Sequence, residues 1–299
     1  MSIARKLIPS GEEQFPFKIQ ITTTLANTVF TVPLVDYGGL APQLTINWGD
    51  SSSSPLITSS TSINRTHTYV SPGTYIISIT GFMPGFKVNN NTSIRSLITA
   101  IIQWGNVGLR TMDFYGCVNI TSIPTSASIS SFGGYTGLSE MVLFSSFMRG
   151  TRITTIPDDL FDYSPNATTF ANAFDAITTL TSVPNGLFDN VPLASTFASC
   201  FLACTALTSV PTDLFDQNIN VINFSSTFRN CRSLVNVLQF TYNTNVSIFN
   251  NIYNMSTTAN ALTGTAPELW NRIPAPSGTD AFNNCINLSN FASIPLNWK

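Results

Sequence analysis

The sequence predicts a mainly β protein in two parts: a small antiparallel β-sandwich, followed by a solenoid of strand and short-helix coils. The solenoid is predicted by apolar residues that recur every 27 positions, at Phe147, Phe174, Phe201, Phe228, Met255 and Phe282. A fixed period of this length is typical of repeats that bury their apolar faces only by stacking on one another. The sandwich is predicted by residues 15–84, which lack the period and contain short alternating runs.

Residues 1–14 are expected to form a flexible N-terminal arm. Short strands are then predicted at 17–24, 30–36, 44–50 and 67–80. The segments G-D-S-S-S-S-P and S-P-G-T-Y supply the Gly and Pro residues at which the chain reverses direction. Strands of this length with turns between them indicate an antiparallel sandwich of small-domain size.

Two motifs in this part resemble the polycystic-kidney-disease (PKD) type of Ig-like domain. They are I-N-W-G-D-S-S-S at 46–53 and H-T-Y-V-S-P-G-T-Y at 67–75, and the resemblance covers residues 15–84. In that family a Gly usually follows W-G-D, whereas this chain has Ser51. The resemblance implies a module that spaces or presents other domains in surface and virion proteins.

The same resemblance assigns roles to the aromatic residues of the two motifs. Trp48 is expected in the core, with Tyr69 and Tyr75 beside it. His67, the only histidine of the chain, is expected to form a structural hydrogen bond rather than to bind a ligand.

Residues 85–299 contain the repeated pattern F-x-x-C-x-x-L-x-x-(V/I)-P. The L-x-x-(V/I) segment is short and β-branched, which favours a strand. Phenylalanines four residues apart, such as Phe170 and Phe174, favour a short helix that packs inward. Residues 94–114 are expected to form the entry coil, which caps the exposed end of the core.

This half of the chain resembles the BspA-like leucine-rich repeats of bacterial surface proteins, whose unit reads F-x-x-C-x-x-L-x-x-I-P. The resemblance covers residues 94–299, and the last segment, F-N-N-C-I-N-L-S-N-F-A-S-I-P, is similar to the usual end of such arrays. It implies an extracellular recognition protein, commonly an adhesin. It identifies no ligand and carries over no catalytic residue.

The composition restricts the classes of partner. Hydrophobic residues make up 43% of the chain, charged residues only 9%, and the net charge is −2. Without a basic excess, nucleic acid and anionic membranes are not expected as partners. Because charged residues are so few, Ser, Thr and Asn are expected to form the surface. No apolar run reaches the ~18–20 residues of a membrane helix, and the first residues lack the apolar core of a secretory signal.

The cysteines are expected to be reduced. Four of the five occupy the same repeat position: Cys117, Cys204, Cys231 and Cys285. Equivalent residues on neighbouring coils lie about 4.7–4.9 Å apart with parallel side chains, whereas a disulfide needs closer, converging Cβ atoms. We expect a column of small buried side chains. Cys200 is expected to share a helical turn with Cys204.

No catalytic motif is evident. A single histidine excludes two-histidine sites, and neither a Walker A nor a Rossmann motif is present. Asp162, Asp189 and Asp216 recur every 27 residues, and such a row could bind Ca²⁺. We favour a turn-closing role, because Gly186 interrupts the second acidic column. No enzymatic activity, cofactor or metal is expected, although calcium binding by these three residues stays open.

These observations predict a virion surface protein of a phage, either a head fibre or decoration protein or a tail receptor-binding protein. It would be made in the host cytoplasm, bind other virion proteins through its N-terminal arm and Ig-like domain, and bind host-surface glycan or protein through its repeats. The alternatives are a bacterial cell-surface adhesin, a structural capsid cement and a carbohydrate-active enzyme. The ligand, the place on the particle and homo-oligomerisation stay open.

The predicted binding face consists of polar residues beside the repeat strands, with two tryptophans that could stack on sugars. The polar residues are Thr154, Thr181, Ser182, Thr208, Ser209 and Asn236. The tryptophans are Trp104 and Trp270.

Overall fold

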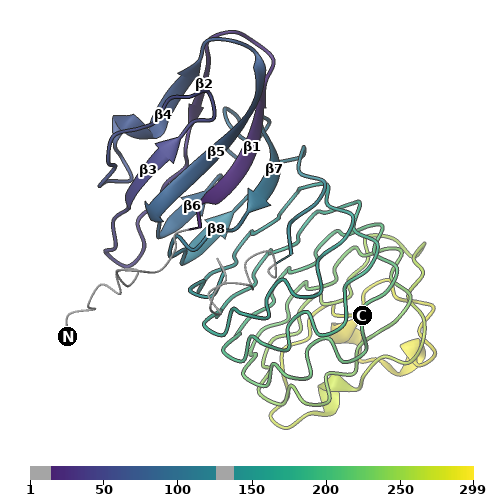
Figure 1. Cartoon of the computed structure of the whole chain (residues 1–299). Helices are drawn as coiled ribbons and strands as arrows, with labels where there is room; N and C mark the ends of the chain where they lie inside the picture. Colours follow the sequence, from purple (N-terminus) through teal and green to yellow (C-terminus); the bar gives the residue numbers. More distant parts are fainter. Residues whose placement is uncertain (1–14, 126–137) are drawn as a thin grey trace, which may run out of the picture.

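The computed structural model describes residues 15–125 and 138–299, so the predicted arm at residues 1–14 lies outside the described residues. The chain is mainly β, with antiparallel sheets toward its N-terminus and stacked loops toward its C-terminus (Figure 1). The helices given for the described residues are 3-10 turns of three residues: η1 (Ile63–Arg65), η3 (Leu269–Asn271), η4 (Phe291–Ser293) and η5 (Leu296–Trp298). No helix in these two ranges is long and apolar enough to span a membrane.

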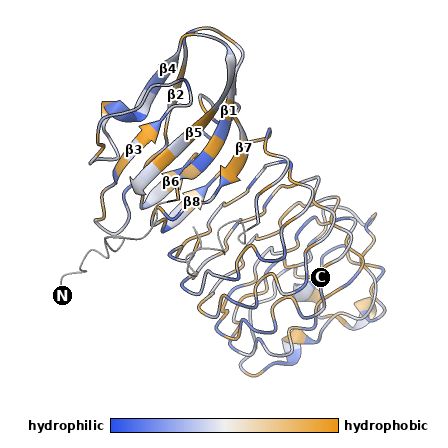
Figure 2. Ribbon diagram, viewed as in Figure 1, coloured by the Kyte–Doolittle hydropathy of each residue, from blue (hydrophilic) through white to orange (hydrophobic). Residues whose placement is uncertain are grey.

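Six strands build the antiparallel part, as a four-stranded sheet in the order β3-β5-β1-β7 and a separate pair, β2-β4. Their bounds are β1 (Phe17–Thr23), β2 (Thr28–Thr31), β3 (Gln43–Asn47), β4 (Thr66–Tyr69), β5 (Gly73–Phe82) and β7 (Ile98–Gln103). Along β1 every second residue is buried, and Figure 2 shows the matching alternation of hydropathy. This alternation is expected when only one face of a sheet covers a core.

An aromatic cluster fills the core of this part. Trp48 is buried, and the His67 ring stacks on it at a centroid distance of 5.0 Å. The Tyr69 hydroxyl donates to the Trp48 carbonyl at 2.8 Å, and the Tyr75 ring lies 4.2 Å from Tyr69. His67 Nε2 lies 2.7 Å from a carboxylate oxygen of Asp50. The predicted core position of Trp48 and the hydrogen-bonding role of His67 are confirmed.

Ser51 adopts a backbone conformation that its side chain disfavours. Its φ is 74°, in the left-handed region, where a Cβ atom approaches the following carbonyl. The preceding Gly49 also has a positive φ, of 83°, and a Cβ there would lie 2.7 Å from the Ile76 carbonyl oxygen. The turn therefore needs glycine at Gly49 and tolerates serine at Ser51 at some cost in stability.

The main sheet continues past residue 84, where the sequence analysis placed a domain boundary. β7 lies within the segment expected to be the entry coil, yet it pairs antiparallel with β1. β6 (Gly85–Lys87) and β8 (Thr111–Asp113) pair in parallel. The ring of Phe86 lies 5.2 Å from Phe17 and 5.3 Å from Phe114. One apolar core therefore joins the N-terminal sheet to the rest of the chain.

From β6 onward, successive passages of the chain, called coils below, pair in parallel. The Gly85↔Thr111 pair is followed by single bridges, which link Thr111↔Leu143, Leu143↔Thr169, Thr169↔Thr196, Thr196↔Asn223, Asn223↔Ile248 and Ile248↔Ser277. Backbone amides also connect the coils, as when Phe170 donates to the Thr196 carbonyl at 3.0 Å. Neighbouring coils consequently lie side by side in Figure 1.

Columns of phenylalanine fill the interior of the coils. Phe174, Phe201 and Phe228 stack at centroid distances of 5.5 and 5.7 Å, with interplanar angles of 8° and 1°. Phe188 and Phe215 form a second column, 5.7 Å apart. Offset stacking of aromatic rings at such distances is favourable beyond the area that it buries.

The predicted short helix in each coil is wrong. The segment that contains Phe170 and Phe174 is a series of turns in which Asn172 and Ala176 have φ values of 57° and 59°. A right-handed helix requires negative φ at every residue, so these two positions exclude it. The L-x-x-(V/I) segments do not form the predicted strands either. Within the described residues, their β pairing is the isolated parallel bridge Ser182↔Ser209.

The cysteines are free and buried, as predicted, but they also form hydrogen bonds. The thiols of Cys204 and Cys231 donate to the carbonyls of Phe174 and Phe201 on the preceding coil, at 3.1 and 3.0 Å. Burial raises the pKa of Cys231 to about 12. The thiols of Cys204 and Cys231 therefore stay protonated, and each adds one hydrogen bond between coils.

Replacement of Ser51 by glycine is expected to stabilise the protein by about 0.5–1 kcal/mol, because the left-handed conformation costs a residue with a Cβ roughly 1–2 kcal/mol and glycine returns part of this as unfolded-state entropy. Denaturant unfolding measures the difference. Ser53→Gly is the matched control, since Ser53 lies in the same turn without a positive φ. The control is expected to lose stability, and a gain of equal size in both variants would contradict this account.

Candidate binding site

Five of the predicted polar residues form one exposed strip across neighbouring coils. Thr154, Thr181 and Thr208 are exposed, as are Ser182 and Ser209. Both the amide and the hydroxyl of Thr208 donate to the Thr181 carbonyl, at 2.9 and 3.0 Å. The 27-residue register therefore brings hydroxyl groups from three coils to one face.

The strip ends at the next coil. Asn236 is half-buried, and its amide group is paired with the backbone of Val210: the Val210 amide donates to Oδ1 at 3.4 Å, and Nδ2 donates to the Val210 carbonyl at 3.1 Å. Val235 occupies the position of the threonines and is 46% exposed. Asn236 therefore links coils and does not offer its side chain to a ligand.

The two tryptophans belong to the interior and not to a binding face. Trp104 is fully buried, donates through Nε1 to the Pro124 carbonyl at 3.1 Å, and lies 5.8 Å from the ring of Phe147. The expectation that Trp104 could stack on a sugar is therefore wrong. Trp270 is half-buried against Phe282 and Trp298, at centroid distances of 6.4 and 5.9 Å, in the C-terminal end of the stack.

The acidic ladder lies at a different edge of the coils, where the Leu-Phe-Asp segments turn. The amide of each ladder aspartate donates to the carbonyl three residues earlier, at 3.2 Å for Asp162, 3.0 Å for Asp189 and 2.9 Å for Asp216. Each aspartate thus belongs to a turn; Asp162 and Asp189 are exposed, and Asp216 is half-buried. Within residues 15–125 and 138–299, no group of three or more His, Cys, Asp or Glu is arranged to hold a metal ion.

Crowding of the carboxylates perturbs their ionisation. Partial burial, together with repulsion from Asp213 and Asp162, raises the pKa of Asp189 above its ordinary value. Partial burial, together with repulsion from Asp213 and Asp189, raises the pKa of Asp216. None of the ladder aspartates takes part in an ion pair given for the described residues, so this edge carries net negative charge.

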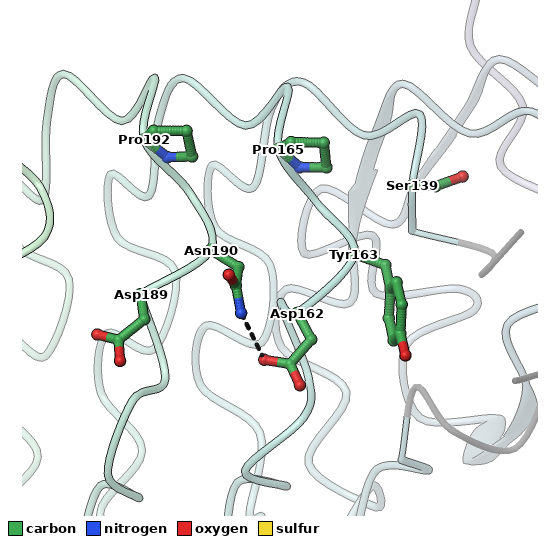
Figure 3. Close-up of a pocket in the computed structure, with 7 residues that line it drawn as sticks. All are labelled: Ser139, Asp162, Tyr163, Pro165, Asp189, Asn190 and Pro192. Carbon is green, nitrogen blue, oxygen red and sulfur yellow. Dashed lines mark hydrogen bonds between the residues drawn. The ribbon is translucent and has the colours of Figure 1, made fainter. Parts of the chain in front are cut away.

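Three coils of this edge border an open groove of about 420 Å³. It is lined by Ser139, Asp162, Tyr163, Pro165, Asp189, Asn190 and Pro192 (Figure 3). Asn190 Nδ2 donates to the Asp162 carboxylate at 3.2 Å, which ties their two coils together at the groove. The groove thus combines hydrogen-bonding groups with an aromatic ring and two proline rings, a mixture common in small-molecule sites.

The groove was not among the sequence-based candidates, although part of its signal is visible in the sequence. Tyr163 and Asn190 occupy one position of neighbouring coils, directly after the ladder aspartates. Because the residue at this position changes from coil to coil, it does not serve the common packing. Variable residues next to an invariant turn were the available signal.

A further aspartate of this stretch, Asp175, has a structural partner. Arg149 Nε lies 2.7 Å from Asp175 Oδ2, and the Arg149 guanidinium lies 4.5 Å from the centroid of the Tyr115 ring. Within the described residues Oδ2 accepts no hydrogen bond, so the contact is an ion pair at short distance without an aligned N–H. These three residues come from three successive coils, and the pair is not available to a ligand.

Asp216→Asn is expected to remove part of the repulsion in the ladder. The raised pKa means that the folded protein binds this proton more tightly than the unfolded chain does, so ionisation of Asp216 costs stability as the pH rises through the ordinary carboxyl range. The variant should therefore gain roughly 0.3–0.5 kcal/mol over the wild type near neutral pH at low salt, the scale of exposed charge pairs. Thermal unfolding across that pH range measures the gain, which added salt should reduce. A gain that is independent of pH and salt would contradict the repulsion.

The sequence matches no model of a known protein family and is similar to no curated protein. The likeness to PKD-type domains and to BspA-like repeats therefore rests on the motifs in the sequence itself. These comparisons supply no activity that could be assigned to the sites described above.

Proposed function

We propose that this chain is a non-enzymatic protein of a virion surface, which binds a glycan or a protein of the host surface through its repeats. It would be a head fibre or decoration protein, or a tail receptor-binding protein. Residues 15–84, together with strand β7 (Ile98–Gln103), would form a PKD-type Ig-like sandwich, and the rest of residues 85–299 a solenoid of BspA-like leucine-rich repeats. The sandwich and the N-terminal arm would hold the chain on the particle.

Two features of the backbone support this architecture. Parallel bridges recur at one register from Thr111 to Ser277, as expected for a solenoid. The main sheet and the β2-β4 pair enclose a common aromatic core, as expected for two layers of a sandwich.

The observation that carries the binding proposal is the exposed strip of hydroxyl groups. Thr154, Thr181 and Thr208 are held in one register by the backbone of three coils. The Thr208 hydroxyl already donates to the Thr181 carbonyl, but its oxygen can still accept a hydrogen bond, and the hydroxyls of Thr154 and Thr181 can both donate and accept, so the strip suits a neutral, hydroxyl-rich partner. Because the coils share one packed core, the groups are positioned before a ligand arrives, which lowers the entropy cost of binding.

The buried thiols support folding in a reducing compartment, such as the host cytoplasm in which a phage assembles. All five cysteines are free and buried. Proteins that mature in oxidising compartments commonly form disulfides instead.

Immunogold labelling of lysate particles with an antibody against residues 94–299 tests the location. Label on capsids or tails is expected, and its position distinguishes a decoration protein from a receptor-binding protein. Label confined to bacterial envelopes would contradict the proposal and favour an adhesin.

Replacement of Thr154, Thr181 and Thr208 together by alanine tests the binding face. The strip loses its hydroxyl groups while the core keeps its side chains, so we expect adsorption of the purified protein to host cells to fall roughly tenfold, or about 1.4 kcal/mol. The matched control replaces three exposed threonines elsewhere on the repeats, Thr212, Thr241 and Thr258. Equal adsorption by both triple variants would show that the strip is not the binding face.

A further inference from the structure

The groove at the acidic edge is lined mainly by two equivalent coil segments, and Ser139 of the preceding coil completes it. Residues 162–165 and 189–192 stand in register, so that Asp162 lies beside Asp189 and Pro165 beside Pro192 (Figure 3). The hydrogen bond from Asn190 to Asp162, 3.2 Å long, joins the two segments. Its volume of about 420 Å³ is within the ~300–1,000 Å³ that small-molecule sites occupy.

The apolar lining of the groove consists of Tyr163 and two prolines. The Tyr163 side chain is 40% exposed, unlike the buried phenylalanines that fill these coils. Pro192 is exposed and Pro165 is exposed beside it. An exposed aromatic ring next to polar groups favours a ligand with one apolar and one polar face, such as the C–H face of a sugar ring.

The polar groups of the groove select the charge of the ligand. Asp162 and Asp189 are both acceptors, and within the described residues no hydrogen-bond donor reaches the Asp189 carboxylate. Neither Asp162 nor Asp189 belongs to an ion pair given for the described residues. Partial burial and the neighbouring carboxylates raise the pKa of Asp189, so the negative charge of this side chain is unfavourable in the groove. A cationic group of the ligand would relieve this repulsion, and an anionic group would increase it.

We propose that this groove binds a hexose unit with a protonated amino group, as in a glucosamine polysaccharide. The sugar ring would pack on Tyr163, its amine would pair with Asp189, and its hydroxyls would bond to Asp162 and Asn190. This inference goes beyond the proposed function: it adds a second glycan site, on a face other than the threonine strip, and does not name the ligand of that strip.

The test is isothermal titration of the purified full chain with three tetrasaccharides at mildly acidic pH, where amines are protonated. Glucosamine tetramer is expected to bind, N-acetylglucosamine tetramer roughly tenfold more weakly, or by about 1.4 kcal/mol, and galacturonic acid tetramer not at all. Added salt should weaken binding of the glucosamine tetramer, since the charge pair is close to solvent.

Two variants locate the site. Asp189→Asn and Tyr163→Ala should each reduce glucosamine binding roughly tenfold, with thermal unfolding measured to confirm that both variants are folded. Asp216→Asn is the matched control: it neutralises the same ladder position one coil further on, outside the groove, and should weaken binding much less than Asp189→Asn, because it changes only the more distant charge of the ladder.

Four results would overturn the proposal. They are equal binding of the three tetrasaccharides, binding that survives in both groove variants, an equal loss in Asp216→Asn, and tighter binding of a tetralysine peptide than of the glucosamine tetramer. This outcome is independent of the particle labelling. If the protein labels virions but does not bind the glucosamine tetramer, only the groove proposal is refuted. If it binds the glucosamine tetramer but is found on bacterial envelopes, only the virion location is refuted.

Discussion

Each coil completes its backbone hydrogen bonds only through its neighbours. The Phe170 amide donates to Thr196, and the Phe197 amide donates to Asn223 one coil further on. Because an unpaired buried amide costs free energy, this pairing fixes the register of one coil on the next. Once the register is fixed, side chains at equivalent positions must stack. The phenylalanine columns, the thiol column, the threonine strip and the acidic ladder are all consequences of the same pairing.

The unusual composition follows from the same constraint. A coil made of turns leaves many carbonyl groups without a strand partner, and small polar side chains satisfy them. Asn218 donates to the carbonyls of Phe188 and Val191, at 2.9 and 3.3 Å, and Asn243 donates to Phe215 and Asn218, at 2.8 and 3.2 Å. A chain with only 9% charged residues is thus rich in asparagine and threonine for structural reasons as well as for its surface.

Features that depend on local pattern could be predicted from the sequence. The core position of Trp48 and the structural hydrogen bond of His67 follow from the resemblance to PKD-type domains, and the burial of the cysteines follows from the 27-residue period. The positive φ values of Asn172 and Ala176 could not, because alanine has no local preference for that conformation and contacts between coils impose it. Trp104 was misplaced because its burial depends on packing against Phe147, more than forty positions away.

The groove shows the same limit at the proposed glycan site. Tyr163 and Asn190 lie far apart along the chain, and neither belongs to the repeat pattern that identifies the coils. Their proximity follows from the coil register, whereas their chemistry follows from residues that vary within it. A period predicts which positions meet but not which side chains a ligand would contact there.

The pairing of β7 with β1 has a mechanical consequence. A force applied to a ligand on the coils reaches the N-terminal sheet through paired strands and through the contact of Phe86 with Phe17, rather than through a flexible linker. The two parts should therefore tilt together as one lever. A partner bound to the repeats would be held at a fixed angle to whatever anchors the N-terminal end, so that torque, and not only tension, is transmitted between them.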